Sequence, residues 1–169
     1  MKRIFFITTL LVAIVLNGCI KNDPVIYEDA RLEFDAAIWN ANGAGLNYPI
    51  LTRVPAQNVA TGSGQASLTR TSGSVQLRVN LVGAQRTSPI TFTYEVVAGE
   101  STAVAGTHYT APSGTGTIPA NSSFGFITID ILNPGASTGS KIIVLQLMDV
   151  NEVKVSANYA KVGLSIAQG

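Results

Sequence analysis

The side chains that could perform acid, base or metal chemistry are few in this 169-residue sequence, which has one His, one Cys and ten Asp plus Glu. A single cysteine cannot form an internal disulfide or a thiolate zinc site, and a single histidine cannot form a multi-histidine metal site. Two carboxylate pairs have spacings that could serve acid/base chemistry, Glu33 with Asp35 and Asp149 with Glu152. We interpret the first pair as the solvated face of a strand and the second as a hairpin turn. We therefore predict no catalytic residue, no cofactor and no metal site, and a protein that is not an enzyme.

Aromatic and amide side chains near residue 40 form the candidate ligand-binding group. Trp39 is the only Trp of the chain, and Asn40, Asn42 and Tyr48 follow it closely. An aromatic ring offers an apolar face on which a sugar can stack, and a carboxamide both donates and accepts hydrogen bonds. These residues could therefore bind a glycan. The alternative is that Trp39 fills one end of a hydrophobic core.

The only cysteine follows a short apolar segment at the N-terminus. Lys2 and Arg3 precede residues 4–16, which are apolar except for two threonines. A membrane-spanning helix needs about 20 apolar residues, so this run has the length of the apolar region of a signal peptide. The sequence Leu16-Asn17-Gly18-Cys19 that ends it resembles the bacterial lipobox, in which the cysteine is acylated and becomes the mature N-terminus.

The lipobox resemblance implies a location. It implies a signal peptide over residues 1–18, acyl groups such as palmitate on Cys19, and a flexible lipidated tether over residues 19–29. Lys21 and the acidic residues after it resemble the export tag of some surface lipoproteins. We therefore expect a protein anchored by lipid in the outer membrane and exposed at the cell surface.

The rest of the chain has the pattern of strands and turns. Residues 74–82 and 89–98 alternate between apolar and polar side chains, which is typical of half-buried strands. Denser apolar runs fit strands buried against a second sheet. The expected strands are residues 30–39, 74–82, 89–98, 123–132, 141–150 and 159–167, with turn-forming residues between them.

About seven short strands predict an all-β fold, a single Greek-key β-sandwich of the immunoglobulin-like kind over residues 30–169. Residues 51–74 contain no aromatic side chain and are rich in small residues. They could form a long loop or an irregular edge strand.

Three short motifs resemble the Calx-beta domain. Residues 105–109 read Ala-Gly-Thr-His-Tyr, residues 114–121 contain a short strand followed by Ile-Pro-Ala-Asn, and residues 127–131 alternate as Ile-Thr-Ile-Asp-Ile. The resemblance covers roughly residues 74–149 and implies a Calx-beta-like, seven-stranded sandwich in which Tyr109 packs beneath its corner. His108 stands where the family usually has Asp, and the carboxylates that should follow Ile131 are missing.

Calcium binding is therefore not expected, because calcium needs six to eight oxygen ligands. We interpret His108 as a turn residue with a structural hydrogen bond rather than a general base.

Charge and family resemblance together favour a binding role. A net charge of +1 gives no reason to expect nucleic acid, whose binding relies on clustered Lys and Arg. We expect a non-catalytic surface lipoprotein that binds or scaffolds, accessory to polysaccharide capture, with a glycan or an outer-membrane protein complex as its partner. The alternative is a cell-adhesion or structural module that binds protein.

Overall fold

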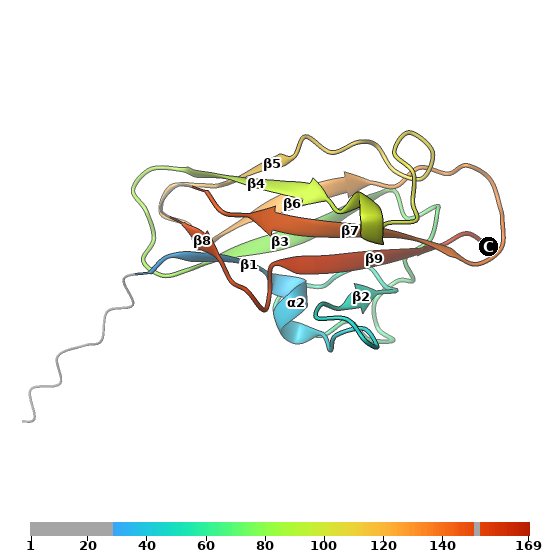
Figure 1. Cartoon of the computed structure of the whole chain (residues 1–169), viewed down its shortest axis with the longest axis horizontal. Helices are drawn as coiled ribbons and strands as arrows, with labels where there is room; N and C mark the ends of the chain where they lie inside the picture. Colours follow the sequence, from blue (N-terminus) through green and yellow to red (C-terminus); the bar gives the residue numbers. More distant parts are fainter. Residues whose placement is uncertain (1–28, 151–152) are drawn as a thin grey trace, which may run out of the picture.

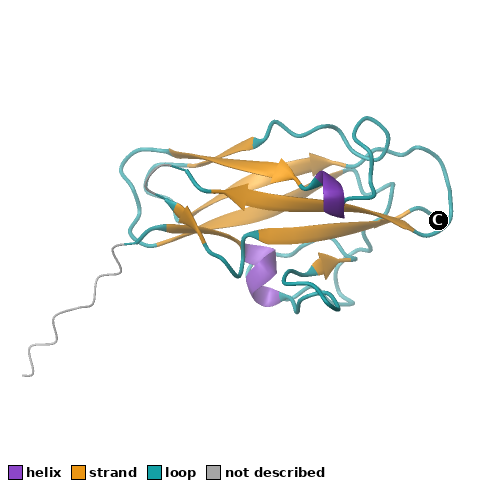
Figure 2. Ribbon diagram, viewed as in Figure 1, coloured by secondary structure: helices purple, strands orange, loops and turns teal. Residues whose placement is uncertain are grey.

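The strands expected from period-two alternation form the sheets of the protein. The computed structural model describes residues 29–150 and 153–169 (Figure 1). Their strands are β1 (Arg31–Phe34), β2 (Ile50–Leu51), β3 (Ser74–Val82), β4 (Ile90–Val96), β5 (Thr115–Ile118), β6 (Phe124–Asp130), β7 (Ser140–Met148), β8 (Lys154–Val155) and β9 (Lys161–Ala167). Two short helical pieces accompany them, the α-helix α2 (Asp35–Trp39) and the 3₁₀ turn η1 (Ala98–Glu100) (Figure 2). The expected signal peptide, Cys19 and all of the expected tether except Asp29 lie outside the described residues.

The strands pair into two sheets that pack face to face. One has the order β6-β3-β1-β8 and the other the order β2-β9-β7-β4-β5. In the first, β3 pairs antiparallel with β6, with Asn80 opposite Phe124 and Arg78 opposite Phe126. Strands β7 and β9 cross in front of β3 and β6 in Figure 1. The expected all-β sandwich is confirmed: the described residues contain seven strands of four or more residues and two of only two residues.

The core lies between the two sheets and is filled by the expected faces of the strands. Alternate residues of β3 are buried, from Val75 to Leu81, and so are Phe92 and Tyr94 of β4. Each large apolar side chain buried in this way contributes about 1.5–3 kcal/mol. Tyr109 is also buried in this core, as the Calx-beta resemblance implied.

Strands β5 and β6 close one long side of the sandwich. They are the edge strands of different sheets, yet they run against each other. A Cβ atom at Gly125 of β6 would overlap the carbonyl oxygen of Thr117 in β5. Only glycine allows this close approach, so the outer edge of β6 is covered.

The expected strand over residues 30–39 is only half right. Leu32 and Phe34 are buried as a strand predicts, but β1 ends at Phe34 and helix α2 begins at Asp35. The physical reason is that the side chain of Asp35 is buried and hydrogen bonded, which turns the chain away from the sheet. Asn40 then stops the helix, because its side-chain amide donates to the carbonyl oxygen of Ala36 at 2.7 Å.

The segment between β1 and β3 forms a flank beside the sandwich, seen along the lower edge of Figure 1. It is neither a plain loop nor a full edge strand. Strand β2 pairs in parallel with β9 for two residues, and isolated bridges join Arg53 to Ser67 and Thr69 to Ala167. Leu68 is buried in the core. The segment thus extends the edge of the five-stranded sheet and carries helix α2.

The chain enters and leaves the sandwich at opposite ends (Figure 1). Asp29 lies beside the loop between β3 and β4, whereas Gly169 lies at the far end. Among the described residues, no helix is both long and apolar enough to cross a membrane.

Candidate ligand-binding face

Trp39 lies on the surface, at the last position of helix α2, and not in the core. Its side chain is 47% exposed, so the interpretation that it fills one end of the sandwich is wrong. Its indole Nε1 donates a hydrogen bond to Oδ1 of Asp35, 3.3 Å away. The ring is therefore both accessible and held in one orientation.

Asp35 is the buried anchor of this surface. Its side chain is only 2% exposed, which corrects the expectation of a solvated strand face. Oδ2 accepts a hydrogen bond from the backbone N–H of Asn58 at 2.7 Å, and Oδ1 accepts from Nδ2 of Asn80 at 3.1 Å. Because these donors come from the flank and from strand β3, Asp35 joins three separate segments.

Glu33, two residues earlier, lies partly buried on the same side. Burial raises the pKa of its carboxyl group, a hydrogen bond with Asn80 lowers it, and the nearby charge of Asp35 raises it further. The net direction is upward, since removing a carboxylate from water disfavours its charged form. The pair is thus less solvated than the sequence suggested.

The other predicted ligand-binding residues have different surroundings. The amide of Asn40 is occupied, because its Oδ1 accepts from the backbone N–H and the hydroxyl of Thr61 at 2.9 and 2.7 Å. Tyr48 is only 3% exposed, so its ring is not presented to solvent. Asn42 lies exposed in the loop between them. The geometry therefore favours Trp39 and Asn42 over Asn40 and Tyr48, and the role of all four in binding stays a prediction.

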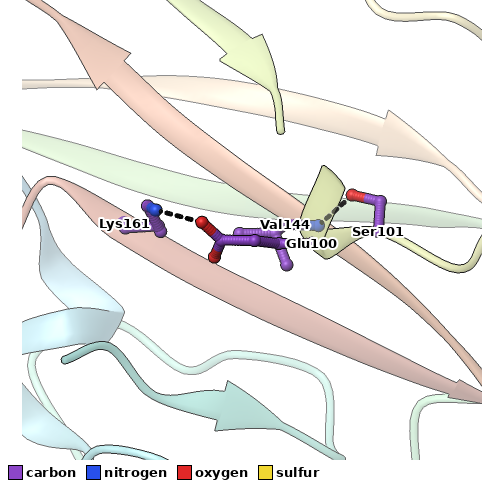
Figure 3. A network of polar contacts seen from close by, with 4 residues as sticks. All are labelled: Glu100, Ser101, Val144 and Lys161. Atoms are coloured by element: carbon purple, nitrogen blue, oxygen red, sulfur yellow. Dashed lines mark hydrogen bonds and ion pairs between the residues drawn. The ribbon is translucent and has the colours of Figure 1, made fainter. Parts of the chain in front are cut away.

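Tyr48 instead belongs to a polar network that holds the flank to the five-stranded sheet. Lys161 Nζ lies 2.7 Å from Oε1 of Glu100, and the same Nζ lies 5.2 Å from the centre of the Tyr48 ring. Figure 3 shows this ion pair beside the hydrogen bond from the backbone N–H of Val144 to Oγ of Ser101. Burial and the hydrogen bond with Glu100 raise the pKa of Tyr48 to about 12.

Two phenylalanines on the outer face of the four-stranded sheet were missed by the sequence reasoning. Phe124 is 36% exposed and Phe126 is partly exposed, and their rings meet edge to face with centres 5.7 Å apart. The guanidinium carbon of Arg78 lies 4.1 Å from the centre of the Phe124 ring. The phase of the alternation could have found them. They share a face with Thr128 and Asp130, while Ile127 and Ile129 face the core.

Trp39 and the pair Phe124 and Phe126 are two exposed aromatic groups on one connected surface. Nη1 of Arg78 donates to Oδ1 of Asn58 at 3.0 Å, and the backbone of Asn58 donates to Asp35, which holds Trp39. We call the outer surface made by Trp39, Asn58, Arg78, Phe124 and Phe126 the aromatic face.

The residues considered for catalysis have structural contacts. Nδ1 of His108 accepts a hydrogen bond from the backbone N–H of Val104 at 3.0 Å, so the expected turn role is confirmed. Asp149 accepts a hydrogen bond from the backbone N–H of Val155 at 2.8 Å, and its Oδ2 lies 3.4 Å from Nζ of Lys154. The hydrogen bond from Val155, together with Lys154, holds the pKa of Asp149 below its usual value. The bridge between Val150 and Val153 fits the expected hairpin, although Glu152 itself lies outside the described residues.

Residues 135–139 read Gly-Ala-Ser-Thr-Gly, which has the Gly-x-Ser-x-Gly spacing of a nucleophile elbow. That motif requires a sharp turn from a strand into a helix. Here the segment is an exposed loop that leads into strand β7, and Ser137 donates its backbone N–H to the carbonyl oxygen of Gln168. The motif therefore does not have the geometry of an elbow.

The described residues contain no group of three or more His, Cys, Asp or Glu side chains that could hold a metal ion. A groove of about 550 Å³ lies at the end of the sandwich where the chain enters. It is lined by one guanidinium, two hydroxyls and four apolar side chains: Arg86, Ser88, Pro89, Ile90, Thr91, Val150 and Val153.

Comparisons with known proteins show the fold. No family model matches the sequence, and no curated protein matches it. The crystal structure of the apo-form Calx CBD1 domain is similar, with a TM-score of 0.53 and 16% identity over 81% of this chain and 96% of that one. The crystal structure of CBD12 from CALX1.2 has a TM-score of 0.52 and 16% identity over 80% of this chain and 45% of that one. The fold is Calx-beta-like, as the three sequence motifs implied.

Proposed function

We propose that this protein is a non-catalytic binding module that holds a carbohydrate at the aromatic face. It is attached to the outer membrane through acyl groups on Cys19, faces outward, and serves polysaccharide capture beside a larger uptake complex. The lipobox resemblance supports the location, and the exposed aromatic side chains support the ligand class.

The observation that carries the proposal is the state of Trp39. An indole with 47% of its surface exposed offers a large apolar area on which the C–H groups of a sugar ring can stack. Its N–H is already satisfied by the buried carboxylate of Asp35, so the ring is fixed before any ligand arrives. Binding to a preorganised side chain loses less conformational entropy than binding to a mobile one.

The second candidate function is an adhesion module that binds protein by adding a strand to a sheet edge. The edge strands of the described sheets are too short or too well covered to pair with an added strand. Strands β2 and β8 have two residues each, and β6 is covered by β5 at Gly125. A protein partner would therefore have to bind a face instead of an edge.

Tryptophan fluorescence tests the ligand class directly, because Trp39 is the only Trp in the chain. We expect one or more neutral oligosaccharides to change the emission of the purified protein in a saturable way, and we expect Trp39→Ala to abolish binding measured by calorimetry. Val104→Ala is the matched control, since Val104 is 56% exposed in a different part of the fold. Undiminished binding by a folded Trp39→Ala variant would contradict the proposal.

The location has a separate test. Labelled palmitate should be incorporated into the protein in cells and lost in the Cys19→Ser variant, which should leave the membrane fraction. Protease added to intact cells should degrade the parent protein. If the Cys19→Ser variant keeps the label and stays with the membrane, the lipid anchor is refuted.

A further inference from the structure

We infer that the carbohydrate site extends from Trp39 across the outer face of the four-stranded sheet to Phe124 and Phe126, and that it takes several units of one neutral polysaccharide chain. This rests on the proposed function and adds a second subsite and a ligand class to it.

The aromatic face is held together by contacts along its whole width. A continuous series of contacts leads from Trp39 through Asp35, Asn58 and Arg78 to Phe124. The donor–acceptor distances in this series are 3.3, 2.7 and 3.0 Å, and it ends with the guanidinium of Arg78 stacked 4.1 Å from the ring centre. Both exposed aromatic groups are therefore parts of one preorganised surface.

The two aromatic groups of the face are separated by other side chains. Phe124 lies opposite Asn80, and Asn80 lies opposite Glu33 on β1. Neighbouring strands are roughly 5 Å apart, and from Asn80 the contacts continue through Asp35, which accepts hydrogen bonds from both Asn80 and Trp39. The side chains of Asn80 and Asp35 therefore lie between the two aromatic groups, so these groups contact different units of a chain.

Polar side chains lie between the aromatic groups. A small hollow of about 10 Å³ lies there, room for about one water-sized group. Its lining combines two carboxamides with one carboxylate, one guanidinium and apolar side chains: Asp35, Ala36, Pro55, Ala56, Gln57, Gln76 and Arg78. Carboxamides donate and accept at once, which matches sugar hydroxyls.

The charges in this hollow point to a neutral chain. Arg78 and Asp35 line it together, so the positive charge of the guanidinium is opposed by a carboxylate, and Glu33 lies on the same side of the sheet. An acidic polysaccharide would require unopposed positive charge.

Two buried polar atoms beside Phe124 are also unsatisfied. Within the described part of the chain, neither Nε of Arg78 nor Oδ1 of Asn80 has a hydrogen-bond partner. Burying an unpaired polar group costs about 1–3 kcal/mol. Because both atoms are buried, they lie beneath the aromatic face, and a ligand hydroxyl on its surface does not reach them.

Chain length is the variable that tests this inference. The probes are maltohexaose, cellohexaose, mannohexaose and xylohexaose, each with its disaccharide, titrated into the purified protein by calorimetry and by Trp39 fluorescence. We expect one hexaose to bind about tenfold or more tightly than its disaccharide, because only the longer chain reaches the phenylalanines. Phe124→Ala should reduce the affinity for the hexaose to about that for the disaccharide, whereas Trp39→Ala should weaken the binding of both.

The outcomes separate the inference from the proposed function. Gln76→Ala, on the exposed side of β3, is the second variant if Phe124→Ala does not fold, and it should weaken only the hexaose. Equal affinity for hexaose and disaccharide, with dependence on Trp39, would overturn the extended site and keep the proposed function. Failure of every saccharide to bind would overturn both. Both would also be overturned if no saccharide binds and the parent protein self-associates in a way that Phe124→Ala abolishes. The face would then hold a second copy of this chain.

Discussion

Removing the carboxylate of Asp35 is the sharpest perturbation of the aromatic face. Asp35 accepts three hydrogen bonds, from the indole of Trp39, the backbone of Asn58 and the amide of Asn80. In Asp35→Ala all three donors lose their acceptor in a place where the side chain is only 2% exposed. The variant should therefore lose both stability and the fixed orientation of Trp39.

The size of the loss follows from the surroundings of each donor. An unsatisfied buried donor costs about 1–3 kcal/mol, and donors that regain water cost less. Trp39 is half exposed and its N–H can be hydrated, so the backbone of Asn58 and the amide of Asn80 account for most of the effect. We expect the free energy of unfolding to fall by about 2–4 kcal/mol. Asp35→Asn should lose somewhat less stability, because its amide keeps one acceptor oxygen. It should still be less stable than the parent, because its NH₂ group then faces another donor.

Urea denaturation followed by circular dichroism measures the stability, and Trp39 emission in the absence of urea reports the release of the indole as a red shift. Glu33→Ala is the matched control, since Glu33 precedes Asp35 by two residues and is less buried. It should have the smaller effect and leave the emission in place. If Asp35→Ala loses less than about 1 kcal/mol with unchanged emission, Asp35 does not anchor the face.

Three further predictions follow from the fold. Burial raises the pKa of Glu33, so its charged form destabilises the folded state, and Glu33→Gln should be more stable than the parent at pH 7. The difference between their urea midpoints should shrink as the pH falls toward 4, and a constant difference would contradict this. In the same assay, Gly125→Ala should lower the free energy of unfolding by about 1–3 kcal/mol, because its Cβ would overlap the carbonyl oxygen of Thr117. Gly64→Ala is the control and should be nearly neutral, because its Cβ would meet nothing within 4 Å. Because the pKa of Tyr48 is raised to about 12, the protein should lose stability as the pH rises from about 10 to 12. Ultraviolet titration of the parent should show a step near pH 12 that is absent from Tyr48→Phe.

Local periodicity was enough to predict most of the sandwich. Strand β3 has the expected bounds, and the predicted face of β9 is buried in full from Val162 to Ile166. These positions follow a period of two because each strand has one face against the core. The Calx-beta-like motifs added the short strand β5 and the buried Tyr109, which alternation alone did not supply.

The parts that could not be predicted depend on partners far along the chain. Asp35 is buried because Asn58 and Asn80 donate to it, and these lie 23 and 45 residues away. No local pattern contains that information, so the change from strand β1 to helix α2 was missed. Phe124 and Phe126 were missed for a different reason: the alternation over residues 124–130 does put them on the face away from the core, but only the burial of this apolar run against the second sheet was predicted.

The position of β1 bears on how the module would carry a mechanical load. The chain enters through Arg31 into a strand that lies between β3 and β8, with four residue pairs to the first and two to the second. Tension along this strand runs at right angles to its hydrogen bonds with β3, so they must all yield together instead of opening one after another. If the proposed tether pulls on Arg31 along the strand while the proposed ligand holds the aromatic face, the sheet is loaded in shear, the direction in which a paired strand resists rupture best.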